Sequence, residues 1–255
     1  MNTVQRLLSN TALAFLANVV SKASTSILFI LIGRVLGPTA SGTFSLGTTY
    51  FTIVFGLSAL GLHALLVRQV APRRGESGRY FSNYLFLRAG FSLLTYLLLV
   101  AGLRFFLPYS PETEQVILIL ALAALPEAIL DLCAALFEAH EMLGPPALAA
   151  GVNSAIKIAG GFWLLQNGAG VVAIAWLMVA ASTLSLFVLP PALVSLFRRA
   201  PQSAPARLDL EFSRGQLRQT PSFFVIHLFS VLDYQTDAFL ISLLLTETEL
   251  GYYSA

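Results

Sequence analysis

The stretch QVILILALAALPEAILDLCAALF, residues Gln115–Phe137, decides the fold class of this chain. Apart from its first residue, only Glu127 and Asp131 carry strongly polar side chains. A helix of roughly 20 apolar residues spans the hydrocarbon core of a bilayer. A helix is also required there, because lipid offers no hydrogen-bond partner to an open backbone. The stretch therefore predicts a membrane-spanning helix.

The composition of the whole chain extends this prediction. Of 255 residues, 56% are hydrophobic and 11% are charged, and the mean hydropathy is +0.77. A soluble domain carries about 25% charged residues, so an ordinary soluble enzyme, a disordered chain and a nucleic-acid binder are excluded. Six further apolar stretches predict an all-α, polytopic helical membrane protein with about seven transmembrane helices. They are Leu8–Ile32, Thr43–Val67, Ser82–Leu107, Ala147–Gln166, Val171–Leu196 and Ser222–Leu245.

The basic residues predict the orientation of these helices. With a cytoplasmic N-terminus, the outer loops hold only Arg34 and Arg104. Cytoplasmic loops are enriched in Lys and Arg, so we expect the N-terminus of this chain in the cytoplasm and its C-terminus outside. The basic loops fix this topology and would also meet anionic lipid headgroups. The cytoplasmic set is Arg6, Arg68, Arg73, Arg74, Arg79, Arg198, Arg199, Arg207, Arg214 and Arg218.

Four predicted helices carry a pair of polar residues near mid-span. Each pair has i, i+4 spacing, which places both side chains on one helix face. A charge at the centre of a membrane helix costs roughly 2.5–3.5 kcal/mol, so it is retained where it faces protein or a water-filled cavity. The shared depth therefore predicts a central polar cavity. The pairs are Asn18 and Lys22, Glu127 and Asp131, Asn153 and Lys157, and Asp233 and Asp237.

The signs of these charges predict their roles. Lys22, Lys157 and Arg88 would bind an anionic headgroup, with Asn18 and Asn153 beside the lysines. Arg88 is nearer the cytoplasmic end of its helix, where it would reach the membrane surface or mark the cytoplasmic mouth of the cavity. The acids would neutralise the lysines or carry protons or ions; they are Glu127, Asp131, Asp233 and Asp237. A structural alternative stays open, in which Lys22 with Asp233, or Lys157 with Glu127, only holds helices together.

Small residues and prolines predict how the helices pack and bend. Pro126 and the pair Pro190-Pro191 would kink or break their helices. On the fifth predicted helix, a stripe of small residues at i+4 spacing faces away from Asn153 and Lys157, and we expect it to pack closely on a neighbour. The stripe is Ala147, Gly151, Ala155 and Ala159.

Motifs of enzyme chemistry are missing from the sequence. It contains no His-Glu-x-x-His pair and no phosphate-binding Gly-x-x-x-x-Gly-Lys-Ser/Thr loop. Cys133 is the only cysteine, which excludes an internal disulfide and a thiolate metal cluster. We therefore predict no enzyme activity, no catalytic residue, no metal and no cofactor. A membrane-embedded glycan-processing enzyme that uses the acid pairs remains an alternative.

Two segments carry a family resemblance. IGRVLGP at Ile32–Pro38, followed by GTFSL at Gly42–Leu46, resembles a signature of polysaccharide-biosynthesis flippases. DAFLIS at Asp237–Ser242, followed by GYYSA at Gly251–Ala255, resembles the segment that closes helix seven and opens helix eight in that family. These are the lipid-linked oligosaccharide flippases of the multidrug/oligosaccharidyl-lipid/polysaccharide exporter superfamily.

The resemblance implies an architecture and an activity. Family members have two helical lobes around a central cavity, and they move a polyprenyl-diphosphate-linked oligosaccharide across the bacterial inner membrane by alternating access. The chain would supply a six-helix lobe at 1–196, a cytoplasmic basic linker at 197–220 and the first helix of a second lobe at 221–255. The resemblance also implies that Arg34, Gly37, Pro38 and Gly42 form a turn and pack helices.

The implied partners are the glycan substrate, membrane lipids and a second lobe. Because the chain stops where an eighth helix would begin, we expect a truncated or split gene product, with the second lobe encoded separately. A multidrug cation antiporter of the same superfamily is the alternative within this fold. It would use the acids for coupling rather than the lysines for binding.

Overall fold

The computed structural model describes residues 3–106, 109–199 and 208–218, together with positions 220, 221, 225 and 229. These residues form helices and connecting turns, with no strand among them, so the all-α prediction is confirmed. The long apolar helices also confirm a polytopic membrane protein. The helices are α1 (Thr3–Leu36), α2 (Pro38–Ala59), α3 (Leu62–Val70), η1 (Arg74–Glu76), α4 (Ser77–Phe106), α5 (Pro111–Leu122), α6 (Ala124–Ala139), α7 (Gly144–Gln166), α8 (Val171–Leu186), α9 (Pro190–Arg199) and α10 (Leu210–Leu217).

Candidate membrane spans in the described residues correspond to the first six predicted ones. Five are single or nearly continuous helices, and α2 with α3 forms a sixth that is bent by 40°. The seventh prediction, Ser222–Leu245, falls outside the described residues, as do Asp233 and Asp237. The five spans other than α2 with α3 are Phe15–Leu36, Arg74–Phe105, Pro111–Ala139, Gly144–Gln166 and Val171–Arg198.

Three of the spans are interrupted near residues that cannot continue a regular helix. Pro126 has no N–H to offer the carbonyl of Leu122, and α5 ends at Leu122. Pro190 begins α9 after α8 has ended at Leu186. Between α2 and α3, Leu60 and Gly61 both adopt left-handed φ angles, of 47° and 68°. These breaks set the direction of α3 and α6, which carry part of the site.

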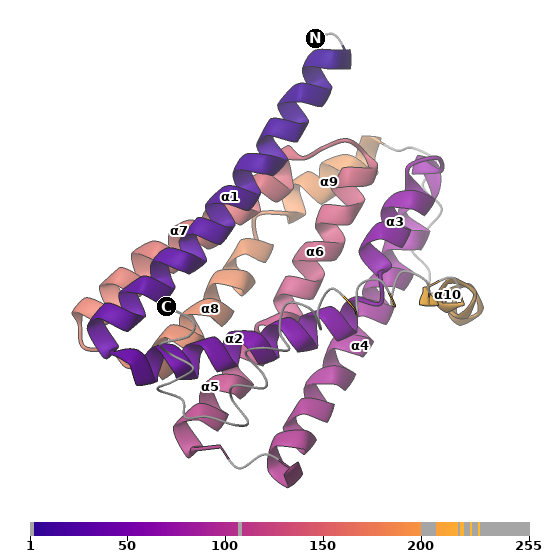
Figure 1. Cartoon of the computed structure of the whole chain (residues 1–255). Helices are drawn as coiled ribbons and strands as arrows, with labels where there is room; N and C mark the ends of the chain where they lie inside the picture. The colour runs from indigo at the N-terminus through magenta and orange to yellow at the C-terminus, as the bar shows by residue number, and fades with distance from the viewer. Residues whose placement is uncertain are drawn as a thin grey trace.

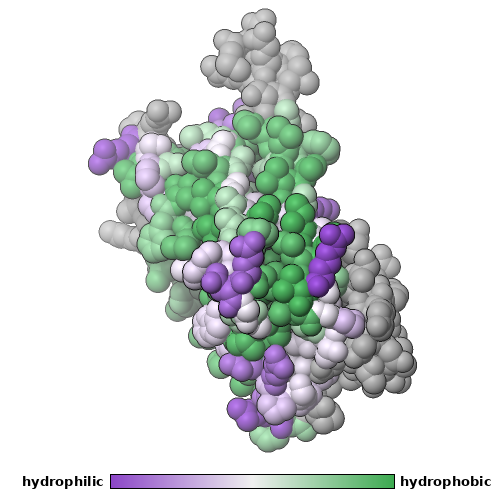
Figure 2. Space-filling model, turned by 90° about the vertical axis from the view of Figure 1, so that its left-hand side faces the viewer, coloured by the Kyte–Doolittle hydropathy of each residue, from purple (hydrophilic) through white to green (hydrophobic). Residues whose placement is uncertain are grey.

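Packing brings distant parts of the chain side by side. α1 lies along α7, α2 along α5, and α8 fits against both α5 and α7 (Figure 1). Leu28 and Ile32 of α1, Phe44 of α2 and Ile174 of α8 are fully buried in one core cluster. The outer surface is largely hydrophobic on the side shown in Figure 2. Such a surface suits contact with lipid chains.

Glycine determines the turn between α1 and α2. Gly37 has φ 89° and ψ 179°, a conformation that is essentially restricted to glycine. Pro38 follows as the first residue of α2, where its missing N–H costs nothing. Gly42 is buried in α2, and Arg34 is exposed at the end of α1. The motif that carries the family resemblance thus forms a tight reversal between two helices.

The predicted small-residue stripe of α7 is not its close-packing face. Ala155 and Ala159 are exposed, and a Cβ added to Gly151 would meet no atom within 4 Å. The close contacts instead involve Gly160, whose Cβ would lie 2.5 Å from Leu177 Cδ1 of α8, and Gly161, which abuts Leu28 of α1. The stripe prediction was wrong because residue size alone does not say which face meets a neighbour.

A short helix, α10, lies within the predicted linker 197–220. Asp209 caps it: the carboxylate accepts a hydrogen bond from the backbone N–H of Phe212 at 2.9 Å and pairs with Arg79 of α4 at 2.7 Å. The side-chain oxygen of Asn83 accepts from the Asp209 backbone N–H at 2.7 Å and from the Ser213 hydroxyl at 3.0 Å. This part of the linker is therefore docked on the first turns of α4.

Replacing Asp209 by alanine is expected to release α10 from α4, because one substitution removes both the helix cap and the ion pair. Hydrogen exchange of the amides of residues 210–217 should become much faster at neutral pH. Glu211→Ala, which removes an exposed acid from the first turn of the same helix, is the control and should change little. Equal exchange in both variants would show that the cap and ion pair do not hold α10.

The contacts of the Asp209 carboxylate make the docking of α10 on α4 depend on pH. The Phe212 N–H and then Arg79 hold the pKa of Asp209 below its usual range. A depressed folded-state pKa contributes stability that is present above the unfolded-state pKa and is lost as the pH falls through the folded one. Docking of α10 should therefore weaken only in acid, and Asp209→Ala should lose this pH dependence.

Candidate functional site

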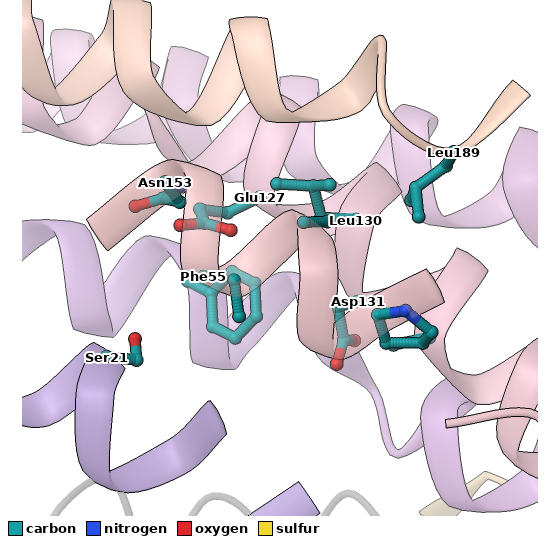
Figure 3. A pocket seen from close by; sticks show the side chains of 11 residues that line it. Ser21, Phe55, Glu127, Leu130, Asp131, Asn153 and Leu189 are labelled. Atoms are coloured by element: carbon teal, nitrogen blue, oxygen red, sulfur yellow. The ribbon is translucent and has the colours of Figure 1, made fainter. Parts of the chain in front are cut away.

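A pocket of about 240 Å³ opens between four helices and the segment before α9. Its walls come from α1, α2, α6 and α7, and both carboxylates of the α6 pair line it (Figure 3). The predicted pairing of Glu127 and Asp131 on one helix face is thus realised as part of one cavity wall. The lining residues are Ser21, Phe55, Glu127, Leu130, Asp131, Ala134, Pro146, Ala149, Ala150, Asn153 and Leu189.

Glu127 is the centre of the first polar group. Its Oε1 accepts a hydrogen bond from the Ser182 hydroxyl of α8 at 3.2 Å, and Asn153 of α7 lies within hydrogen-bonding reach. Lys157, one turn after Asn153, interacts electrostatically with the same carboxylate and is 6% exposed. Asn153 Oδ1 is buried and has no hydrogen-bond partner among the described residues. The polar pairs of α6 and α7 therefore lie together, an arrangement that fits both the predicted cavity and the alternative pairing of Lys157 with Glu127.

Arg88 and Asp131 form the second polar group. The guanidinium of Arg88 is 1% exposed and lies 3.5 Å from Asp131 Oδ2. It also donates to the carbonyl of Phe55 at 3.4 Å and stacks over the Phe55 ring, 4.7 Å from its centroid. Because α4 begins at Ser77, Arg88 lies near the middle of its span rather than at the predicted cytoplasmic mouth. It supports the pocket wall from behind.

His63 completes this second group and was not among the predicted site residues. Its Nδ1 lies 2.8 Å from Asp131 Oδ1, and its Nε2 lies 3.1 Å from Glu138 Oε2. The left-handed residues Leu60 and Gly61 turn the chain so that the first turn of α3 faces α6. The only signal in the sequence was an ionisable residue inside the predicted span Thr43–Val67.

The lysine of α1 is placed differently. Lys22 and Asn18 are exposed on α1, and neither lines the pocket, whereas their neighbour Ser21 does. Glu127, Asp131 and Asn153 thus line one cavity. Arg88 and Lys157 interact with its two acids without lining it, and Lys22 is exposed on α1. No group of three or more His, Cys, Asp or Glu side chains in this part of the chain is placed to hold a metal ion.

Polar contacts also mark both ends of the bundle. At one end, Arg74 pairs with Glu141 at 2.6 Å, and Ser77 Oγ lies 2.8 Å from His140 Nε2. Burial and then the nearby Arg74 charge lower the pKa of His140. At the other end, Arg104 lies 3.5 Å from Glu114. The pocket and its charges lie between these two polar ends.

Comparison with known proteins places this chain in a family. A sequence model described as "Polysaccharide biosynthesis protein" matches residues 7–255. No curated protein and no solved structure gives a significant match. The family match covers nearly the whole chain and agrees with its apolar helices. The chain therefore belongs to the polysaccharide biosynthesis protein family.

Proposed function

We propose that this chain forms one lobe of a flippase that moves a polyprenyl-diphosphate-linked oligosaccharide across the bacterial inner membrane. Family membership supports an exporter of polysaccharide-related substrates rather than an enzyme. The observation that carries the proposal is the pair of half-buried acids of α6 that line one pocket within apolar helices, together with the buried cations Arg88 and Lys157 that interact with them. Charges inside membrane helices face the bundle interior or a water-filled cavity, and they commonly mark a substrate or ion path.

The pocket is too small to hold the whole proposed substrate. A volume of about 240 Å³ is below the range of roughly 300–1,000 Å³ that is usual for sites of drug-sized ligands. An oligosaccharide would therefore need a larger chamber, completed by a second lobe. In our proposal, Lys22 on the exposed face of α1 contacts the diphosphate in that chamber, and Lys157 attracts it from behind Glu127.

The proposed orientation follows the basic residues. Arg74 and Arg79 lie with the docked α10 at one end of the bundle, where they would face the cytoplasm. Arg104 lies at the opposite end, which would face outward. Labelling of single cysteines at these two ends in intact cells, in a Cys133→Ala background, would test this orientation.

A vesicle assay tests the proposal. The protein, with its second lobe where this is encoded separately, is reconstituted with a fluorescent polyprenyl-diphosphate oligosaccharide, and a membrane-impermeant quencher reports the translocated fraction. Lys22→Ala with Lys157→Ala should slow translocation about tenfold, the equivalent of one charge-assisted contact. Arg104→Ala, which removes an exposed cation at the end of the bundle, should leave the rate unchanged. An unchanged rate in the double-lysine variant would contradict headgroup binding by these lysines.

One observation favours a second candidate function, a multidrug cation antiporter. The two charged residues that line the pocket, Glu127 and Asp131, are both acids, whereas the lysines do not line it. An anionic lining attracts cations. Export of a lipophilic cation that is lost in Glu127→Gln and retained in the double-lysine variant would favour the antiporter.

A further inference from the structure

His63 spans two carboxylates that are too far apart on α6 to exchange a proton directly. Asp131 and Glu138 are separated by seven residues, or about 10 Å along a helix that rises 1.5 Å per residue. The imidazole of His63 fills this gap, with Nδ1 at 2.8 Å from Asp131 and Nε2 at 3.1 Å from Glu138. The three side chains therefore form a continuous hydrogen-bonded row along α6.

The two ends of this row have different surroundings. Glu138 lies in the last turn of α6, and its side chain is 50% exposed at the end of the bundle where Arg74 and Glu141 pair. Asp131 lines the pocket, and its side chain is 26% exposed. The row thus leads from the end of the bundle to the pocket.

The charges around His63 suit proton transfer. From α6 it faces Asp131 and Glu138, and from α4 the guanidinium of Arg88 contacts Asp131 from the other side. From α2 the nearby contact is the carbonyl and ring of Phe55, which hold Arg88. Arg88 is a permanent cation, and it contacts the Asp131 oxygen that does not face His63. His63 is the titratable partner of that carboxylate.

We propose that His63 relays protons between Glu138 and Asp131 and so connects one end of the bundle to the pocket. Imidazole is suited to this step, because one ring nitrogen accepts a proton while the other releases one. In a single passage, Glu138 gives a proton to Nε2 as Nδ1 gives its proton to the Asp131 carboxylate. The net movement is one proton from Glu138 to Asp131, and the ring changes tautomer. Before a second passage in the same direction, the side chain must reorient so that an N–H again faces Asp131, whereas the reverse passage only returns the proton to Glu138.

Proton influx into vesicles tests the relay. The protein is reconstituted around a trapped pH-sensitive dye, and a proton gradient is imposed with and without the labelled glycolipid. His63→Gln keeps hydrogen bonding but cannot relay, and it should lower protein-dependent influx by at least about tenfold. His140→Gln and Glu141→Gln, matched changes outside the row, should retain the influx. Wild-type influx in His63→Gln would overturn the proposal.

Two more variants separate a relay from a structural clamp. His63→Lys keeps a cation between the two carboxylates but does not exchange protons readily near neutral pH. Loss of influx in this variant supports the relay, and retention would show that His63 is only a clamp and overturn it. Glu138→Gln changes a half-exposed side chain at the outer end of the row, and it should reduce influx in the same way. This variant decides the question even where a His63 variant fails to fold.

The inference rests on the proposed function in one respect, namely that proton movement would drive glycolipid movement. Measuring proton influx and glycolipid translocation separately shows whether the relay or the proposed function fails. Influx that depends on His63 without glycolipid translocation overturns the proposed function and supports the relay. Translocation without any protein-dependent proton influx supports the function and overturns the relay.

Discussion

Asp131→Asn is expected to lower the free energy of unfolding by about 3–5 kcal/mol, the usual cost of leaving a buried charge without its partner. The substitution leaves the Arg88 guanidinium, which is 1% exposed, with no carboxylate beside it. Its remaining contacts are the Phe55 carbonyl at 3.4 Å and the Phe55 ring, and its Nε already has no hydrogen-bond partner among the described residues. Reversible unfolding in mixed micelles, followed by circular dichroism, measures the change.

Two further variants test the physical cause. Glu138→Gln removes a half-exposed carboxylate from the same helix and should cost about 1 kcal/mol or less. Combining Asp131→Asn with Arg88→Met removes both charges and should recover part of the loss, because no unpaired charge remains buried. If Asp131→Asn were no more destabilising than Glu138→Gln, the guanidinium would be satisfied without Asp131.

The sequence was a good guide to the membrane spans because lipid imposes a simple rule. A run such as Gln115–Phe137 is too long for a membrane β-strand and too apolar for a water-exposed helix. It corresponds to a membrane span in the structure. The start of α4 was less predictable. Arg79 makes its first turn polar, so hydropathy placed the span from Ser82, whereas the helix begins at Ser77. Arg79 and Asn83 there contact Asp209, the cap of α10, which is far away in the sequence.

The candidate site was only partly predictable, for a related reason. Spacing along one helix showed that Glu127 and Asp131 share a face, and that Asn153 and Lys157 share another. Which residues meet them depends on how helices pack. Ser182 reaches Glu127 from α8, and His63 reaches Asp131 because two left-handed residues redirect α3. Neither contact follows from local sequence pattern.

Gly161→Leu is expected to be the most damaging change to the seam between α1 and α7. A Cβ at position 161 would already meet the terminal methyl of Leu28, which is fully buried. A leucine there must push α1 away from α7, and overpacking of this kind costs about 1–3 kcal/mol. Ser21 of α1 and Asn153 of α7 stand on two walls of the pocket. Separation of these helices should therefore also widen the site.

Gly151→Leu is the matched control for this seam, because it makes the same substitution on the same helix. A Cβ at position 151 meets no atom within 4 Å. Both variants gain the same helix propensity, roughly 1 kcal/mol from replacing glycine, so the difference between them isolates packing. We expect Gly161→Leu to be less stable than Gly151→Leu by about 2 kcal/mol. A pair of cysteines introduced on α1 and α7 at disulfide distance should also cross-link less completely in Gly161→Leu. If the two variants had the same free energy of unfolding, α1 and α7 would accommodate a leucine at position 161 without loss of stability. Close packing at Gly161 would then contribute no more to stability than the exposed position Gly151.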